Sequence, residues 1–134
     1  MTRHRFKAEK LVRNKTNERL AAKNVFMKYH IADIEEYQKL LGLKLIEEAT
    51  EVAVAKNTDE IIDELADVLE VVHSILAAHN LSFQTVEASR QEKLKTRGSF
   101  DDRICSEYVD IDESHPLYAH YKSEPDKYPE IEIK

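Results

Sequence analysis

Two stretches decide the fold: LLGLKLIEEATEVAVA, over residues 40–55, and DEIIDELADVLEVVHSILAAH, over residues 59–79. In both, apolar residues recur every three or four positions, which is the spacing of one face of an α-helix. In the second stretch, this core-facing stripe consists of Ile61, Leu65, Val68, Leu69, Val72, Ile75 and Leu76. The 134-residue chain has only two glycines and three prolines, so little interrupts such helices. The sequence therefore predicts one compact all-α domain in which these two helices are consecutive and antiparallel.

Four carboxylates lie at matching positions of the two helices. Glu48 and Glu51 form one i,i+3 pair, and Glu64 and Asp67 form the other. On a helical wheel that starts at Leu41, Glu48 falls at about 340°, inside the apolar stripe, and Glu51 falls at its edge, at about 280°. Glu64 and Asp67 repeat this arrangement on the second helix. Each helix thus carries a core-facing acid followed by a flanking acid.

A carboxylate inside an apolar stripe is strongly destabilising unless its charge is compensated. The usual compensator for four converging acids is a hard divalent cation, Mg²⁺ or Mn²⁺. Two alternatives stay open. In a chain of 134 residues with 26 acids, about five acid-x-x-acid pairs arise by chance and form solvated faces. A buried Glu48 can also pair with Lys44, one helical turn away.

Local signals place the helix ends. Asn57 and Glu60 have the spacing of a capping box, and Ser82 is a cap for a third helix that Gly98 stops. Acids at the start of the first carboxylate helix suit the positive end of its dipole. The predicted helices begin or end near Thr16–Lys23, Asp33–Glu36, Asn57, Asn80, Ser82 and Arg97.

The chain after Arg103 differs in composition. It holds all three prolines and four of the six tyrosines. Residues 108–111, Tyr-Val-Asp-Ile, alternate in polarity and predict a short strand in an otherwise irregular C-terminal tail. Two interpretations of this tail stay open: docking on the domain or on a neighbouring subunit, and a partly disordered acidic segment.

The third helix carries a basic strip. Arg90, Lys93 and Arg97 are spaced i, i+3 and i+7 and therefore share one face. Such a strip can receive phosphate oxygens, or it can be a solvated face that balances the acidic helices. Carboxylates that hold a metal, together with a basic strip for phosphates, point to hydrolysis or transfer at a phosphoanhydride.

Composition weighs against several other classes. The net charge of −6 disfavours a nucleic-acid-binding surface. The single cysteine, Cys105, cannot form an intrachain disulfide, which favours a reducing compartment. Because no stretch has the length of an apolar membrane span or the character of a signal region, we expect a cytoplasmic protein without a membrane partner. A di-iron site is excluded because Glu70 and His73 face away from Glu64.

Three motifs resemble one family. KLIEEATE (residues 44–51) followed by DELADVLE (63–70) looks like the EExxE…ExxD signature of the all-α nucleoside triphosphate pyrophosphohydrolases, which include MazG-like proteins and phosphoribosyl-ATP pyrophosphohydrolase. KLVRNK (10–15) is similar to the KLVRDK segment of the phosphoribosyl-ATP pyrophosphohydrolase-like branch, and RQEKLKTRGSF (90–100) resembles its RxEKxxKRGxF ending. Asn14, Thr16, Asn17 and Ser99 depart from the branch pattern and leave the metal motif intact.

The resemblance implies an antiparallel helical bundle that forms a homodimer or higher homo-oligomer. It implies Mg²⁺-dependent cleavage of a nucleoside triphosphate between the α and β phosphates, which gives a monophosphate and pyrophosphate. By position, the resemblance implies that Glu47 orients or deprotonates the attacking water. The implied metal ligands are Glu48, Glu51, Glu64 and Asp67. The implied phosphate-binding residues are Lys93, Arg97, Lys10 and Arg13. For Lys10 and Arg13, a subunit contact fits as well.

The predicted organisation is a nucleotide pyrophosphohydrolase domain over residues 1–104 and an acidic tail with tyrosines and prolines over residues 105–134. The expected role is the removal of unwanted or modified triphosphates. Two alternatives stay open. One is phosphoribosyl-ATP hydrolysis in histidine biosynthesis, and the other is a non-catalytic helical scaffold that binds nucleotides.

Overall fold

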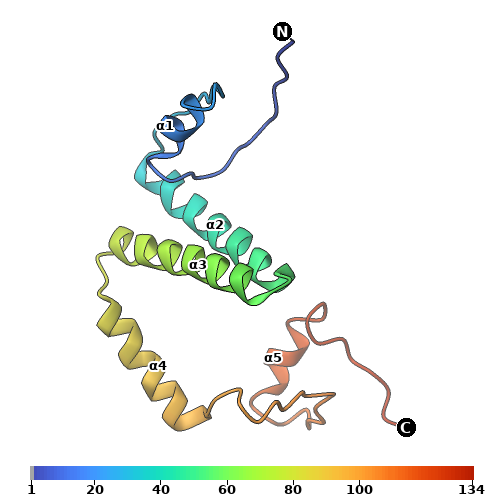
Figure 1. Ribbon diagram of the computed structural model, residues 1–134. Helices are drawn as coiled ribbons and strands as arrows, with labels where there is room; N and C mark the ends of the chain where they lie inside the picture. Colours follow the sequence, from blue (N-terminus) through green and yellow to red (C-terminus); the bar gives the residue numbers. More distant parts are fainter. Residues whose placement is uncertain (1) are drawn as a thin grey trace. The chain divides into compact units, whose positions relative to one another are not determined.

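The computed structural model describes residues 2–134, and the regular secondary structure of this part of the chain is entirely helical. The helices are α1 (Thr16–Ala21), α2 (Ile34–Val54), α3 (Thr58–Ala78), α4 (Phe83–Arg97) and α5 (Tyr118–Lys122) (Figure 1). The all-α prediction is confirmed. The strand predicted at residues 108–111 is wrong, because a strand needs a neighbour for its backbone groups and the described residues supply none.

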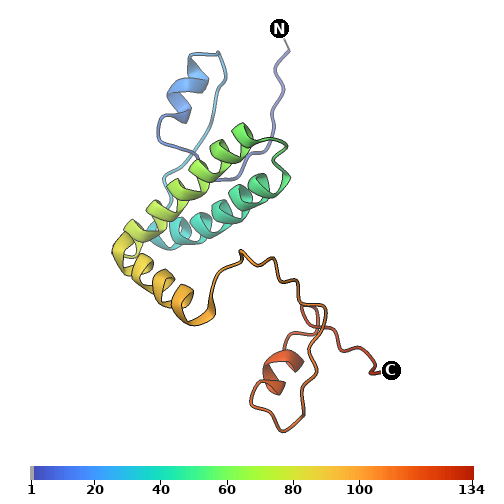
Figure 2. The same cartoon turned by 60° about the horizontal axis from the view of Figure 1, so that its bottom comes forward.

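Helices α2 and α3 form the packed pair that positions the site. They are joined by residues 55–57 and run antiparallel, side by side in both ribbon views (Figures 1 and 2). Among the described residues, the buried apolar side chains are Leu41 of α2 and Val71 and Leu76 of α3. Glu48 is also buried, with 8% of its surface exposed. The prediction that this acid faces the core is therefore confirmed.

Side-chain caps fix the starts of both helices. The Asp33 carboxylate accepts a hydrogen bond from the Glu36 backbone N–H at 2.8 Å, and the Asn57 side-chain oxygen accepts one from the Glu60 N–H at 3.0 Å. The Glu60 carboxylate in turn accepts from the Lys56 N–H at 2.7 Å, one residue before the partner that a capping box uses. The helix boundaries predicted at Asp33 and Asn57 are confirmed.

Replacing Asn57 with alanine removes this cap. We expect Asn57→Ala to lower the free energy of unfolding by about 1 kcal/mol, because the Glu60 N–H loses its acceptor at the start of α3. Urea denaturation followed by circular dichroism measures the change. Asn57→Ser is the matched control, since its hydroxyl can accept the same bond. An equal loss in both variants would show that the hydrogen bond is not the stabilising element.

Helix α4 is also bounded as predicted. The Ser82 hydroxyl accepts a hydrogen bond from the Thr85 N–H at 3.2 Å, and Gly98 follows the helix with a φ of 80°, a left-handed conformation that glycine adopts without steric cost. Nearly every side chain of α4 is exposed. This helix therefore gains little stability from packing within the chain.

The apolar stripe of α3 is only partly covered within the chain. Val68, Val72 and Ile75 are half-buried against the rest of the domain, as predicted. Leu65 and Leu69 were predicted in the same core-facing stripe, yet they are 46% and 54% exposed. That part of the prediction is wrong for the described chain, because one partner helix covers one edge of a stripe this wide and leaves the other edge bare.

The chain divides into two compact units, Met1–Thr96 and Arg97–Lys134. The second unit contains α5, which the prediction of an irregular tail did not include. Its aromatic side chains gather around Tyr121, whose ring centroid lies 4.9 Å from that of Tyr128 and 5.3 Å from that of His120. The predicted functional boundary after residue 104 stays a prediction. Among the described residues, no helix combines the length and the apolar character needed to span a membrane.

Candidate metal and nucleotide site

Three of the four predicted metal ligands converge between α2 and α3. One carboxylate oxygen each from Glu48, Glu64 and Asp67 lies within 4.8 Å of the other two. Oxygens that share one Mg²⁺ at about 2.1 Å lie about 3–4 Å apart, so small side-chain rotations suffice for joint coordination. Three carboxylates are also the hard donor set that Mg²⁺ and Mn²⁺ prefer. The residues present thus fit such an ion.

The electrostatics of the cluster favour a cation. Burial raises the pKa of Glu64, and the negative charges of Asp67, Glu51 and Glu48 raise it further. These like charges penalise the ionised cluster, and a bound divalent cation would remove that penalty. Glu51 acts on Glu64 through its charge, but its own side chain is exposed and the structure does not bring it into the three-oxygen group.

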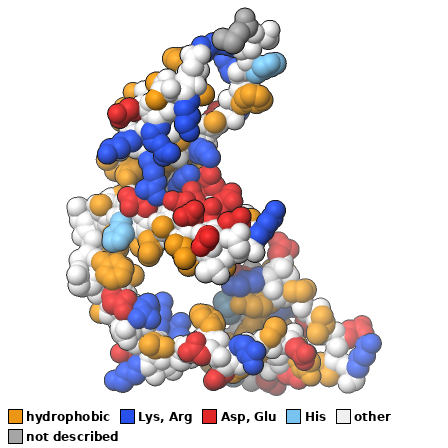
Figure 3. Space-filling view, viewed as in Figure 1, with side chains coloured by type: hydrophobic (Ala, Val, Ile, Leu, Met, Phe, Trp, Pro, Cys, Tyr) orange, Lys and Arg blue, Asp and Glu red, His pale blue; other side chains and the backbone are white. Residues whose placement is uncertain are grey.

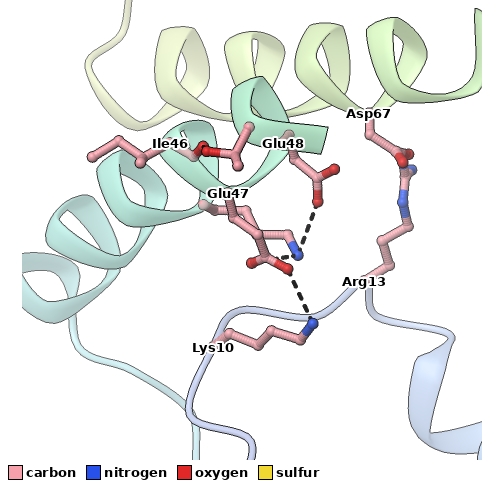
Figure 4. A network of polar contacts seen from close by, with 8 residues as sticks. Lys10, Arg13, Ile46, Glu47, Glu48 and Asp67 are labelled. Carbon is pink, nitrogen blue, oxygen red and sulfur yellow. Dashed lines mark hydrogen bonds and ion pairs between the residues drawn. The ribbon is translucent and has the colours of Figure 1, made fainter. Parts of the chain in front are cut away.

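Glu47 lies at the edge of the cluster and is held by two lysines. It accepts a hydrogen bond from Lys10 at 3.0 Å and one from Lys44 at 3.2 Å (Figure 4). Burial would raise the pKa of Glu47, but these two hydrogen bonds outweigh it and leave the pKa below its ordinary value. Glu47 is therefore a carboxylate that stays ionised and accepts hydrogen bonds.

Lys44 bridges the proposed catalytic and metal-binding acids. Its ammonium lies 3.0 Å from the Glu48 carboxylate and 3.2 Å from that of Glu47. Burial would lower the pKa of Lys44, but the hydrogen bonds to Glu48 and Glu47 raise it above its ordinary value. The alternative that Glu48 pairs with Lys44 is thus realised, beside the carboxylate cluster rather than instead of it. The spacing of these residues in one helix already signalled the contact.

The N-terminal segment, residues 10–15, supplies a second contact to the cluster. Arg13 donates a hydrogen bond from Nη2 to Oδ1 of Asp67 at 2.8 Å. In the close-up view, Lys10 and Arg13 project from this segment toward the acids of α2 and α3 (Figure 4). On the surface, basic side chains lie directly beside the acidic ones (Figure 3). The structure therefore brings both predicted N-terminal phosphate-binding residues to the site.

Within residues 2–134, no ion pair or side-chain hydrogen bond joins the basic strip of α4 to the carboxylate cluster. Lys93 is exposed, and neither it nor Arg97 has an ion pair or a side-chain hydrogen bond within residues 2–134. Arg90 instead binds Glu87, at 2.9 and 2.7 Å. Hydrogen bonds from Arg90 and then Gln91 lower the pKa of Glu87 to about 2. Arg90 is thus engaged with its own helix.

One family model matches the chain. Residues 36–99 match the family described as the MazG nucleotide pyrophosphohydrolase domain. No curated protein and no solved structure matches the chain. The matched segment contains all the predicted metal ligands together with Glu47, Lys93 and Arg97, and it excludes the segment that carries Lys10 and Arg13. Residues 36–99 are thus similar to the MazG-like all-α nucleotide pyrophosphohydrolases, and this match supports a hydrolase that acts on phosphoanhydride bonds of nucleotides.

Proposed function

We propose that the protein is a Mg²⁺-dependent nucleoside triphosphate pyrophosphohydrolase. It cleaves between the α and β phosphates, releases a nucleoside monophosphate and pyrophosphate, and clears unwanted or modified nucleotides. The observation that carries this proposal is the convergence of oxygens from Glu48, Glu64 and Asp67 within the segment that matches the MazG family. The family match supports the reaction class, and the cluster offers a donor set that suits the ion.

Glu48, Glu64 and Asp67 hold the ion in this proposal, and Glu51 joins them by rotation of its exposed side chain. When bound, Mg²⁺ or Mn²⁺ supplies charge neutralisation at the phosphates and a lowered pKa of a coordinated water. Glu48 is the most constrained of these ligands, since its side chain is buried and also held by Lys44. The chain's own contacts thus fix the position of one ligand before any ion arrives.

Glu47 positions the attacking water. Its lowered pKa keeps it ionised at neutral pH, so it accepts a hydrogen bond from the water and orients the oxygen toward phosphorus. A carboxylate with a lowered pKa is a weak base. Of the two roles implied by the family resemblance, orientation therefore fits this side chain better than full deprotonation.

Four cations serve the phosphates in this proposal. Lys10 and Arg13 are supported by their place beside the carboxylates, within hydrogen-bond distance of Glu47 and Asp67. Lys93 and Arg97 are supported by the family match, which extends over α4. A triphosphate that bridges Lys10 and Arg13 to the ion would be held at several oxygens, which fixes the orientation of the α phosphorus.

A second copy of the chain covers the bare edge of α3 in this proposal. Ile61, Ile62, Leu65 and Leu69 lie on consecutive turns of that edge and are 39% to 59% exposed. Figure 3 shows apolar side chains next to the acidic ones on the same face. Exposed apolar edges of this kind, along a helix pair, are suited to four-helix packing. A homodimer therefore places a neighbouring subunit beside the site.

Product identity tests the proposed reaction. ³¹P NMR of the full chain with Mg²⁺ and a panel of common and modified triphosphates should show pyrophosphate and monophosphate appearing together. Release of orthophosphate and diphosphate would contradict cleavage between the α and β phosphates. Turnover of phosphoribosyl-ATP alone would reassign the substrate to histidine biosynthesis. Metal-dependent binding without turnover of any substrate would replace the enzyme with a nucleotide-binding scaffold.

A further inference from the structure

The N-terminal segment is tied to the helix pair by two side-chain contacts. Within residues 2–134, Lys10–Glu47 and Arg13–Asp67 are the only side-chain hydrogen bonds that join positions more than eight residues apart. Both end on acids of the proposed catalytic centre. The polar contacts that tie residues 10–15 to the helix pair therefore use the same carboxylates as the proposed reaction.

Arg13 and a divalent cation compete for Asp67. The guanidinium occupies Oδ1 of Asp67 at 2.8 Å. That carboxylate belongs to the three-residue group whose oxygens lie within 4.8 Å of one another. An ion held by this group would place two positive charges a few ångströms from the guanidinium, and like charges at this distance repel each other even in a half-exposed site. Simultaneous binding of Arg13 and the divalent ion to the Asp67 carboxylate is therefore unfavourable.

We propose that Arg13 is an internal competitor for the metal, and that the divalent ion displaces the segment of residues 10–15 when it binds. This inference rests on the proposed function and deepens it. Arg13, once released from Asp67, is free to bind the phosphates of the incoming nucleotide. Metal binding and nucleotide binding are then coupled, because the ion competes with Arg13 for Asp67 and the phosphates compete with Asp67 for Arg13.

A cavity beneath the segment supports this arrangement. Its volume is about 110 Å³, and its lining residues include Lys10 and Leu11 of the segment and Leu40, Leu43 and Lys44 of α2. The cavity also borders Glu47, so it adjoins the reacting centre. Displacement of the segment would remove one wall of this space, next to Glu47. The segment thus forms one wall of a space that borders Glu47 while Arg13 holds Asp67.

Calorimetric titration of the full chain with Mn²⁺, without nucleotide, tests the competition. We expect Arg13→Gln to bind Mn²⁺ about three- to tenfold more tightly than wild type, because a half-exposed ion pair and a nearby positive charge are both removed. Arg19→Gln removes the same charge from α1 and should leave the affinity unchanged, since within residues 2–134 Arg19 has no ion pair. Unchanged or weaker binding by Arg13→Gln would overturn the proposal.

Two further measurements distinguish competition for Asp67 from an effect of the substitution on folding. Arg13→Lys keeps the charge but loses the guanidinium geometry, so its Mn²⁺ affinity should lie between those of wild type and Arg13→Gln. Brief trypsin treatment, with cleavage sites mapped by mass spectrometry, should cut after Lys10, Arg13 or Lys15 faster when Mn²⁺ is present. Protection of these sites by Mn²⁺ would contradict displacement of the segment.

The outcomes separate this inference from the function on which it rests. If wild type binds Mn²⁺ and hydrolyses triphosphates while Arg13→Gln binds like wild type, only the competition fails. If Arg13→Gln binds more tightly but no variant turns over any substrate, only the enzymatic function fails. If wild type binds no Mn²⁺ at all, both fail.

Discussion

Glu48→Gln is expected to lower the rate of pyrophosphate release at least about 100-fold while the chain stays folded. The substitution replaces an anionic ligand with a neutral amide in the three-residue cluster, so the affinity for the divalent ion and the charge around it both fall. The glutamine is nearly isosteric and Lys44 keeps its contact with Glu47, at 3.2 Å, so we expect little change in stability. A coupled pyrophosphate assay and thermal melting measure the two quantities.

Glu70→Gln is the matched control for this prediction. Glu70 is an exposed acid on α3, outside the carboxylate cluster, and its substitution removes the same charge. Activity within about twofold of wild type is expected for this variant, since exposed charges act weakly at a distance in salt. Equal losses in both variants would mean that net charge, and not coordination at Glu48, limits the reaction.

Leu69→Asp is expected to convert the assembled protein to a monomer at micromolar concentration. Leu69 is 54% exposed on the bare edge of α3, next to Leu65 at 46%. Burying a leucine side chain contributes about 1.5–3 kcal/mol, and a twofold interface loses this twice. The introduced carboxylate adds a desolvation cost, so the dissociation constant should rise at least about 100-fold.

Sedimentation velocity measures this change in assembly. Ile133→Asp makes the same chemical change at an exposed position near the C-terminus, outside the helix pair, and should leave the oligomer intact. A wild-type chain that sediments as a monomer at all concentrations would contradict the proposed homodimer. An oligomer that survives Leu69→Asp would place the interface elsewhere, for instance on the tyrosine-containing second unit.

The sequence predicted the helix starts and the burial of Glu48, because both depend on residues close together in the chain. The starts of α2 and α3 follow from the side-chain oxygens of Asp33 and Asn57, which reach backbone N–H groups three residues later. The burial of Glu48 follows from its place on the helical wheel beside Leu41. In each case the deciding partner lies within about one or two helical turns, so the sequence carries the signal directly.

Contacts over long distances were beyond prediction. Arg13 and Asp67 are 54 positions apart, and no periodicity or capping rule links them. The exposure of Leu65 and Leu69 was missed for a related reason. A helical wheel identifies the apolar face of α3, but it does not say whether the same chain or a second copy covers that face.

The central claim is that this carboxylate cluster drives metal-dependent release of pyrophosphate from a nucleotide. The most direct measurement is pyrophosphate release by the full chain from a panel of triphosphates and phosphoribosyl-ATP, with Mg²⁺, after chelation, and after Mg²⁺ is restored. The account predicts release from at least one substrate that stops on chelation and resumes with Mg²⁺. A folded chain that releases no pyrophosphate from any substrate, or releases it equally well after chelation, would contradict the account.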